Sequence, residues 1–244
     1  MSNSGVIWFY LLSLLAEILG TIGGFGSSVF FVPFANIFFD FHVVLGITAI
    51  FHLSSNLSKI YLFREGLDKQ LLLRMGVPSV IFVILGGYLS SGFSSGILEL
   101  TLGIFLVLLS LVFLVKDKLV IRKGNTEIIG GGALSGFVAG LLGTGGAIRG
   151  LTLAAFNMEK SVFVATSAAI DMAIDTTRTF VYWDAGYLTY DILWYIPILL
   201  LIGFVGSWLG QKILVYIPQT RFKQFSLILV LLIGIFTVIR WWIT

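Results

Sequence analysis

The sequence contains no cysteine, only two histidines and few charged residues. Without cysteine the chain can form no disulfide, no thiolate nucleophile and no persulfide carrier. His42 and His52 alone cannot form a metal cluster, and no nucleotide-binding loop is present, so we expect no metal and no other cofactor. These absences argue against an enzyme and against transport driven by ATP bound to this chain.

Apolar residues make up 58% of the chain and charged residues 11%, with a mean hydropathy of +1.04. Such a composition does not fit a soluble domain or a nucleic-acid-binding protein, and it places the chain in a lipid bilayer. Six apolar runs have about the 20 residues that cross a hydrocarbon core of about 30 Å. We therefore predict an all-α polytopic membrane protein with spans at 43–62, 71–89, 97–115, 162–182, 192–209 and 225–243.

Two glycine-rich segments interrupt the apolar pattern, "ILGTIGGFGSS" at 18–28 and "GLLGTGGAIRG" at 140–150. Matched glycine interruptions in the two halves of a chain are typical of secondary transporters. We predict a first transmembrane repeat over residues 1–115, a cytoplasmic linker over 116–125 and a second repeat over 126–244. Aligning Gly20 with Gly143 also pairs Pro33 with Ala155, Gly66 with Gly186, Pro78 with Pro197 and Gly87 with Gly206.

The glycine-rich segments either cross the membrane or return as re-entrant or broken helix hairpins. If they cross, the halves are parallel and the basic loops at 64–74 and 212–223 fall on opposite faces. If they return, each half makes three crossings, the halves are inverted, and twelve basic residues share one face against Arg178 and Arg240. The positive-inside rule favours inversion, with basic loops cytoplasmic and both termini on the outer face of a bacterial inner (plasma) membrane. The twelve are Lys59, Arg64, Lys69, Arg74, Lys116, Lys118, Arg122, Lys123, Lys160, Lys212, Arg221 and Lys223.

Glycines allow a tight turn near the bilayer midplane, where non-helical backbone must line a cavity or be buried in protein. The arm after each turn begins with unsatisfied N–H groups and the positive end of a helix dipole, which favour a bound anion. The alternative is close helix packing through small residues. The expected backbone ligands of the anion are Gly23, Gly24, Gly145 and Gly146.

The segments "GTIGGFGSSVFFVPF" and "GLLGTGGAIRGLTLAAF", each followed by three spans, resemble the TauE/SafE family of sulfite and sulfonate transporters over nearly the whole chain. The resemblance implies transport of small, mostly sulfur-containing anions, with both segments at the substrate site. The first copy has the family's proline, Pro33. The second has Ala155 in its place and a charged residue, Arg149, just after the turn.

Arg149 lies one turn into the second arm, where its guanidinium is suited to hold sulfonate or carboxylate oxygens. The alternative is a structural ion pair with Asp171 or Asp175. These two acids share a helix face with Arg178 at i, i+4 and i+7. Asp171, Asp175 and Arg178 are candidates for coupling transport to a proton or cation, or for gating it, and the alternative is structural pairing.

Polar residues of the first half suit the same anion. His52, Ser55 and Asn56 fall within one helical turn, and Ser27 and Ser28 lie at the first glycine turn. Glu17 precedes that turn and is a candidate ligand of a coupling ion. Each has a structural alternative: hydrogen bonding between helices for His52, helix packing for the serines and pairing within the hairpin for Glu17.

Three classes of function follow from these residues. A secondary transporter of a small anion, such as a sulfur oxyanion or an organosulfonate, is favoured, working by alternating access at a midplane site between the repeats. A passive anion channel is the alternative. It would also use the positive ends of the two helices to attract an anion, but it would not need buried acids. A membrane-embedded enzyme is disfavoured, since no nucleophile or metal set is apparent.

Overall fold

The structure is a computed structural model that describes residues 3–23, 26–63, 66–115, 124–156, 158–214, 216 and 219–243. Within these ranges the chain is helical and contains no strand. The helices are α1 (Asn3–Gly23), α2 (Ser28–Ala35), α3 (Phe41–Leu62), α4 (Lys69–Ser90), α5 (Ser95–Val115), α6 (Asn125–Leu142), α7 (Gly146–Ala154), α8 (Lys160–Asp184), α9 (Tyr190–Leu193), α10 (Ile196–Leu214) and α11 (Gln219–Ile243).

Six helices are long and apolar enough to cross a bilayer, judged by length and composition within the described residues. A helix of about 22 residues is about 33 Å long, which matches the hydrocarbon core. The prediction of an all-helical membrane protein is therefore confirmed, as are the spans predicted at 43–62, 71–89, 97–115 and 225–243. The six are Ser4–Ile22, Phe41–Leu62, Lys69–Ser90, Ser95–Val115, Ile196–Leu214 and Gln224–Ile243.

Aspartate side chains begin two of these spans. The Asp40 carboxylate accepts a hydrogen bond from the backbone N–H of His42 at 3.0 Å, at the start of α3. The Asp68 carboxylate accepts from Gln70 and Leu71, both at 3.0 Å, at the start of α4. Such caps satisfy backbone donors that have no partner inside the helix.

The first glycine-rich segment differs from its prediction. Gly20 does not break the helix, because α1 continues to Gly23 as a 21-residue helix. The missing side chain of Gly20 instead makes room for the returning chain, since a Cβ there would lie 2.2 Å from the Cα of Ser27. The arm that follows this turn is short, because α2 has eight residues and is followed by turns. The alignment of Gly20 with Gly143 therefore pairs a helical residue with a helix end.

Two predicted spans of the second half also differ. The run at 162–182 lies in α8, which has 25 residues but is not among the six helices that qualify by apolar composition. Asp171, Asp175 and Arg178 lower its hydropathy. The run at 192–209 is divided between the short helix α9 and α10, which begins at Ile196. Pro197 is the second residue of α10. A proline is tolerated there because the backbone N–H groups of the first turn have no partner inside the helix.

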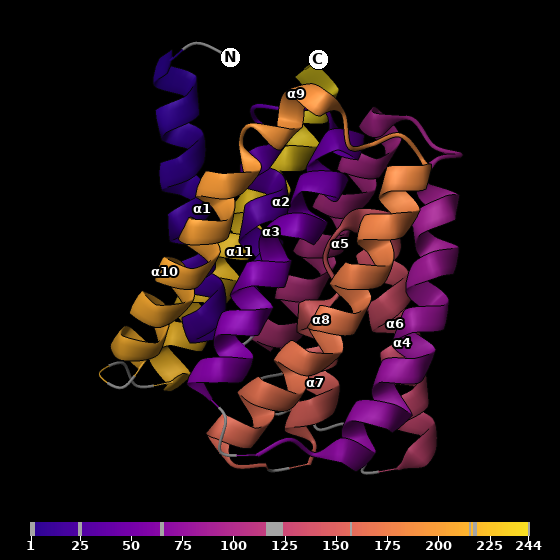
Figure 1. The fold of residues 1–244 in the computed structure, drawn as a ribbon, viewed down its shortest axis with the longest axis vertical. Helices are drawn as coiled ribbons and strands as arrows, with labels where there is room; N and C mark the ends of the chain where they lie inside the picture. Colours follow the sequence, from indigo (N-terminus) through magenta and orange to yellow (C-terminus); the bar gives the residue numbers. More distant parts are fainter. Residues whose placement is uncertain are drawn as a thin grey trace.

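Helices from the two halves pack against each other throughout the bundle. α4 packs on α6 and α1 on α10, while α3 contacts both α8 and α10. α4 also packs on α8, and α5 packs on α11. Figure 1 shows the amino-terminal end of α1 and the carboxy-terminal end of α11 at the same end of the molecule. It also shows α2 in the upper half of the view and α7 in the lower half.

The short helix α2 lies in the interior of the bundle. Seven of its eight residues are buried, including Phe30, Phe31 and Pro33. Ser27, which precedes α2, and Thr144, in the turn between α6 and α7, are buried as well. Irregular backbone at membrane depth is thus covered by protein, as the absence of water in the hydrocarbon core requires.

Candidate functional site

The tips of two helix hairpins meet inside the bundle. The α1–α2 turn contains Gly26, with φ +84°, and the α6–α7 turn contains Gly143, with φ +76°, a left-handed conformation that other residues rarely adopt. A Cβ on Gly26 would lie 3.5 Å from the Cα of Gly146. Ser28 Oγ donates a hydrogen bond to Thr144 Oγ1 at 3.2 Å. Residues far apart in sequence thus form one junction.

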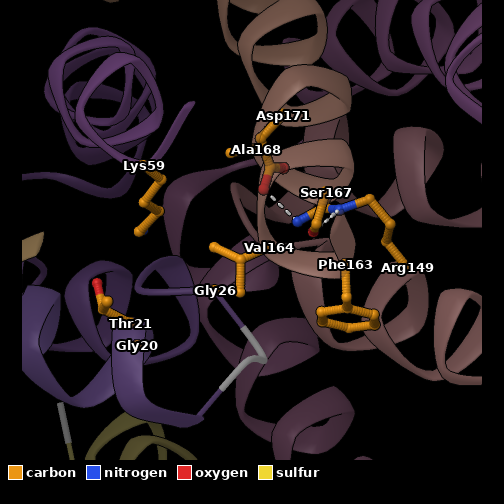
Figure 2. Close-up of a pocket in the computed structure, with 10 residues that line it drawn as sticks. All are labelled: Gly20, Thr21, Gly26, Lys59, Arg149, Phe163, Val164, Ser167, Ala168 and Asp171. Atoms are coloured by element: carbon orange, nitrogen blue, oxygen red, sulfur yellow. Dashed lines mark hydrogen bonds and ion pairs between the residues drawn. The ribbon is translucent and has the colours of Figure 1, made fainter. Parts of the chain in front are cut away.

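Two small cavities of about 40 Å³ and 20 Å³ lie beside this junction. Both are lined by Gly26, Lys59 and Asp171. Figure 2 shows Lys59 on one side of the larger cavity and Asp171 and Arg149 on the other. The smaller cavity reaches Ser27, Ser28, His52, Asn56, Gly143, Gly145, Asp175 and Arg178. These volumes hold only a few water molecules.

Arg149 is buried at the larger cavity, with 2% of its surface exposed. It is the fourth residue of α7, and its side chain reaches α8. The Nε group donates to Ser167 Oγ at 2.9 Å, and the Nη2 group forms an ion pair with Asp171. The Nη1 group is buried and has no hydrogen-bond partner among the described residues. The predicted pairing with Asp171 therefore exists, while one donor of the guanidinium remains uncommitted.

Glu17 forms a second ion pair, with Lys59 of α3. Its Oε1 atom lies 2.8 Å from Lys59 Nζ. The same oxygen accepts from the hydroxyls of Ser55 at 2.6 Å and Ser207 at 2.9 Å, and from Thr21 at 3.1 Å. Lys59 Nζ also donates to Ser55 Oγ at 2.8 Å. The predicted site residues Glu17 and Ser55 thus meet, and they gather residues from α1, α3 and α10.

Lys59 was counted among the basic residues of the cytoplasmic face, but its side chain is buried. It lies within α3, which continues to Leu62, and is only 8% exposed. The buried carboxylate of Glu17 explains the difference, because a paired ammonium can remain inside the protein. Lys59 is therefore a site residue that the sequence interpretation missed.

Asp175 and Arg178 form a third ion pair at the smaller cavity. Asp175 Oδ1 lies 2.8 Å from Arg178 Nε, and Asp175 Oδ2 accepts from the amide of Asn56 at 2.7 Å. Arg178 Nη2 lies 3.4 Å from His52 Nδ1. His52 Nε2 lies 3.1 Å from Ser27 Oγ. The structure thus connects Asn56, His52 and Ser27 of the first half with the acidic helix face of the second.

Arg178 also binds the end of α6. Its Nη1 group donates to the carbonyl of Gly143 at 2.8 Å and to that of Ala139 at 3.3 Å. Tyr182 Oη donates to Gly140 at 2.7 Å. A cation at the carboxyl end of a helix satisfies free carbonyls and opposes the helix dipole. The second turn is therefore positioned by the side chains of α8.

The remaining predicted ligands are backbone positions. Gly24 lies outside the described residues, and Gly23 is the last residue of α1. Gly145 precedes α7, and its carbonyl accepts from Ser135 Oγ at 2.9 Å. Gly146 begins α7. The structure thus places Gly145 and Gly146 at the junction.

Several polar residues of the site were not predicted. All of them except Lys59 are neutral, and for some of them the helical spacing was an available signal. Ser167 precedes Asp171 and Asp175 at a spacing of four, and Lys59 follows Ser55 at the same spacing, so each lies on an identified face. The missed residues are Thr21, Lys59, Thr144, Ser167, Tyr182 and Ser207.

A family model described as sulfite exporter TauE/SafE matches residues 9–237. The chain belongs to this family. The resemblance inferred from the glycine-rich segments is confirmed, and family membership together with the apolar helices identifies an integral membrane protein.

A probable membrane transporter protein of Methanocaldococcus jannaschii is 30% identical over 154 residues, which cover 57% of this chain and 57% of that protein. The chain therefore matches little more than half the length of this curated relative. No solved structure matches the chain.

Proposed function

We propose that this protein is a secondary transporter of a small anion and that the hairpin junction is its substrate site. The observation that carries the proposal is Arg149, a buried cation with an uncommitted N–H group beside a cavity. A donor left unpaired inside a protein is costly, so it indicates a ligand that is bound in another state. A guanidinium suits oxyanions because its planar donors match two oxygens.

The helix ends at the junction support an anionic substrate. α2 begins at Ser28 and α7 begins at Gly146, so both helices direct their amino ends toward the meeting point. Free N–H groups and the helix dipole favour negative charge at such ends. The hydroxyls of Ser27 and Ser28 add neutral donors.

We infer further that the two halves are inverted repeats that expose the site alternately to the two membrane faces. The helix contacts support this proposal, because exchanging the halves converts the α4–α6 contact into α10–α1 and the α3–α10 contact into α8–α4. The position of both cavities at the junction of the two hairpins supports one site shared by the two halves. In this proposal the basic loops are cytoplasmic and both termini are outside a bacterial inner membrane.

The proposed substrates are sulfite, related sulfur oxyanions and organosulfonates. The description of the family as sulfite exporters supports this class. In these anions the oxygens are arranged around a pyramidal or tetrahedral sulfur. Two oxygens can accept from a guanidinium while another accepts from hydroxyl or backbone donors. Glu17, Asp171, Asp175 and Arg178 remain the candidates for coupling or gating.

Substitution of Arg149 tests the proposed site. Arg149→Lys keeps the charge but loses the planar fork, so we expect weaker binding of sulfite or methanesulfonate by the purified protein. Arg149→Gln removes a charge-assisted hydrogen bond worth about 1.5 to 3 kcal/mol, so affinity should fall roughly 10-fold to 150-fold. Calorimetric titration measures both changes. The matched control is Arg74→Gln, which alters an exposed arginine bound to Asn125 and should bind as the parent does.

A folded Arg149→Gln variant that binds as tightly as the parent would refute the assignment. If that variant misfolds and adding Asp171→Asn restores a folded protein that binds as the parent does, Arg149 serves only as the structural partner of Asp171. Flux measurements in liposomes separate the transporter from the alternative, a passive anion channel. A channel lets the anion equilibrate only with the membrane potential, so with the potential held at zero it shows no accumulation and a pH gradient does not drive any.

A further inference from the structure

The junction contains equal numbers of basic and acidic side chains, all of them buried except that of Asp171, which is partly exposed. Among the described residues that line the cavities or pair with their lining, three are cationic and three are carboxylic. Each cation has its own carboxylate, in the pairs Lys59–Glu17, Arg149–Asp171 and Arg178–Asp175.

These groups form one contiguous cluster. Lys59 and Asp171 line both cavities, Arg149 lines the larger one, and Asp175 and Arg178 line the smaller one. Glu17 reaches the cluster through Lys59. The other polar contacts to the ion pairs come from the neutral residues Thr21, Ser55, Asn56, Ser167 and Ser207.

His52 adds no charge to this balance. Its Nδ1 atom faces a guanidinium nitrogen of Arg178 at 3.4 Å. Because a guanidinium only donates hydrogen bonds, Nδ1 must present its lone pair. The proton of the neutral ring then lies on Nε2, which faces Ser27 Oγ. The cluster without substrate therefore has no net charge when all three acids are ionised.

An anion entering a neutral cluster leaves an uncompensated charge inside the membrane. Such a charge is expensive in a medium of low polarisability, unless a partner neutralises it. Protonation of a carboxylate in the cluster removes one negative charge and so balances the charge of the bound anion, without a separate site for a coupling ion. It also frees the cation to which the carboxylate was paired.

We propose that each negative charge on the substrate crosses with one proton carried by Asp171, so that transport is electroneutral. Asp171 is the acid most suited to this exchange, because its side chain is 22% exposed whereas those of Glu17 and Asp175 are 0% and 3% exposed. It also holds the cation that we assign to the substrate. When Asp171 binds a proton, Arg149 is released to bind the anion. When the proton leaves, the carboxylate reclaims Arg149 and displaces the anion.

This inference rests on the proposed function, and proteoliposomes test both. The probe is radiolabelled methanesulfonate, which keeps one negative charge over the pH range used. An inwardly directed proton gradient should drive accumulation at least 10-fold above equilibration. A potassium diffusion potential of either sign, set with valinomycin at equal pH, should change initial uptake by less than about twofold. Accumulation that responds both to the pH gradient and to an inside-positive potential at equal pH would overturn electroneutral coupling while leaving the transporter intact. Accumulation that follows the potential alone is the behaviour of a channel and would overturn the proposed function. No uptake and no binding of any sulfonate, sulfite or short carboxylate would overturn the proposed function itself.

Asp171→Asn provides a second test. The variant leaves one unbalanced positive charge in the cluster, so its uptake should lose its response to the pH gradient and gain a response to an inside-positive potential. The matched control is Asp184→Asn, which changes an exposed acid at the end of the same helix and should keep the parental behaviour. Uptake by Asp171→Asn that is still driven by pH refutes the assignment of the proton.

The double variant Lys59→Gln with Glu17→Gln removes one charge of each sign. The balance is kept, so this variant should transport without response to the potential, although its rate falls with the loss of a cation from the cavity. A response to potential in the double variant would show that charge balance does not govern coupling. The parental measurements decide the inference even if every variant fails to fold.

Discussion

Arg178 has two tasks at the scale of the single residue. It neutralises Asp175 on its own helix, and it donates to the free carbonyl of Gly143 at the end of α6. The first task compensates a buried charge, and the second fixes the turn that forms half of the junction. Its substitution should therefore affect folding before it affects transport.

We predict that Arg178→Gln destabilises the protein by about 3 to 5 kcal/mol, because it leaves Asp175 buried without its cation. The measurement is thermal unfolding in detergent, followed by the fraction of protein that stays monodisperse. Arg178→Gln combined with Asp175→Asn should recover part of the loss, since no buried charge then remains unpaired. Equal stability of the parent and the single variant would contradict this role.

Residue roles were predictable where charge lies in an apolar run. Arg149, Asp171, Asp175 and Glu17 were found because a charge at membrane depth needs a partner or a function. Lys59 was missed because it lies near a helix end, where lysines usually reach the membrane surface. Its burial depends on Glu17, which is 42 residues away in sequence, and no local pattern reveals that pairing.

At the scale of the helix, glycines determine how closely α4 and α6 approach each other. A Cβ at each of three glycines spaced by four residues on α6 would lie 2.1 to 2.5 Å from a carbonyl oxygen of α4. The backbones are therefore in contact, which is the packing that small residues allow in membranes. The facing pairs are Gly132 with Met75, Gly136 with Ser79 and Gly140 with Val83.

We predict that Gly136→Ala lowers the free energy of unfolding by about 1 to 3 kcal/mol, because the new methyl group collides with backbone that cannot rotate away. The same helix offers a matched control in Gly130, where an added Cβ meets nothing within 4 Å. Gly130→Ala should be neutral or slightly stabilising. Thermal unfolding of the two variants in detergent measures the difference, and equal stabilities would refute close packing at Gly136.

The positions of the long helices were more predictable than the points at which the two glycine-rich segments turn. Apolar runs gave most of the spans, because length and hydropathy are local properties. The sequence offered two interpretations of the glycines, tight turns and close helix packing, and the structure contains both. Gly26 and Gly143 form turns, whereas Gly20 and Gly136 permit close contacts. A glycine in the sequence does not reveal which of these it does, since the answer depends on the chain packed against it.

The pairing of helices between the halves is a property of the whole molecule. α3 packs on α8 and α5 on α11, so these two helices each contact their counterpart in the other half. Repetition of the glycine segments predicted two related halves, but the partners of each helix depend on contacts that the sequence does not encode locally. Orientation is different, because charges in short loops predict it directly.

Labelling of introduced cysteines tests the inverted arrangement, and the natural absence of cysteine means that no background reaction interferes. With three crossings in each half, Ser94→Cys after α4 and Tyr190→Cys after α8 lie on the same outer face. If the glycine-rich segments crossed the membrane, these two positions would be separated by an odd number of crossings and would lie on opposite faces. We therefore expect a membrane-impermeant maleimide to label Ser94→Cys and Tyr190→Cys in intact cells. Leu67→Cys, between α3 and α4, should be labelled only after permeabilisation. All three positions are exposed in the structure, so a failure to react reflects the side of the membrane rather than burial. Labelling of Ser94→Cys without Tyr190→Cys would replace the inverted repeats with parallel ones, and the two helix amino ends could then no longer approach one midplane site from opposite faces.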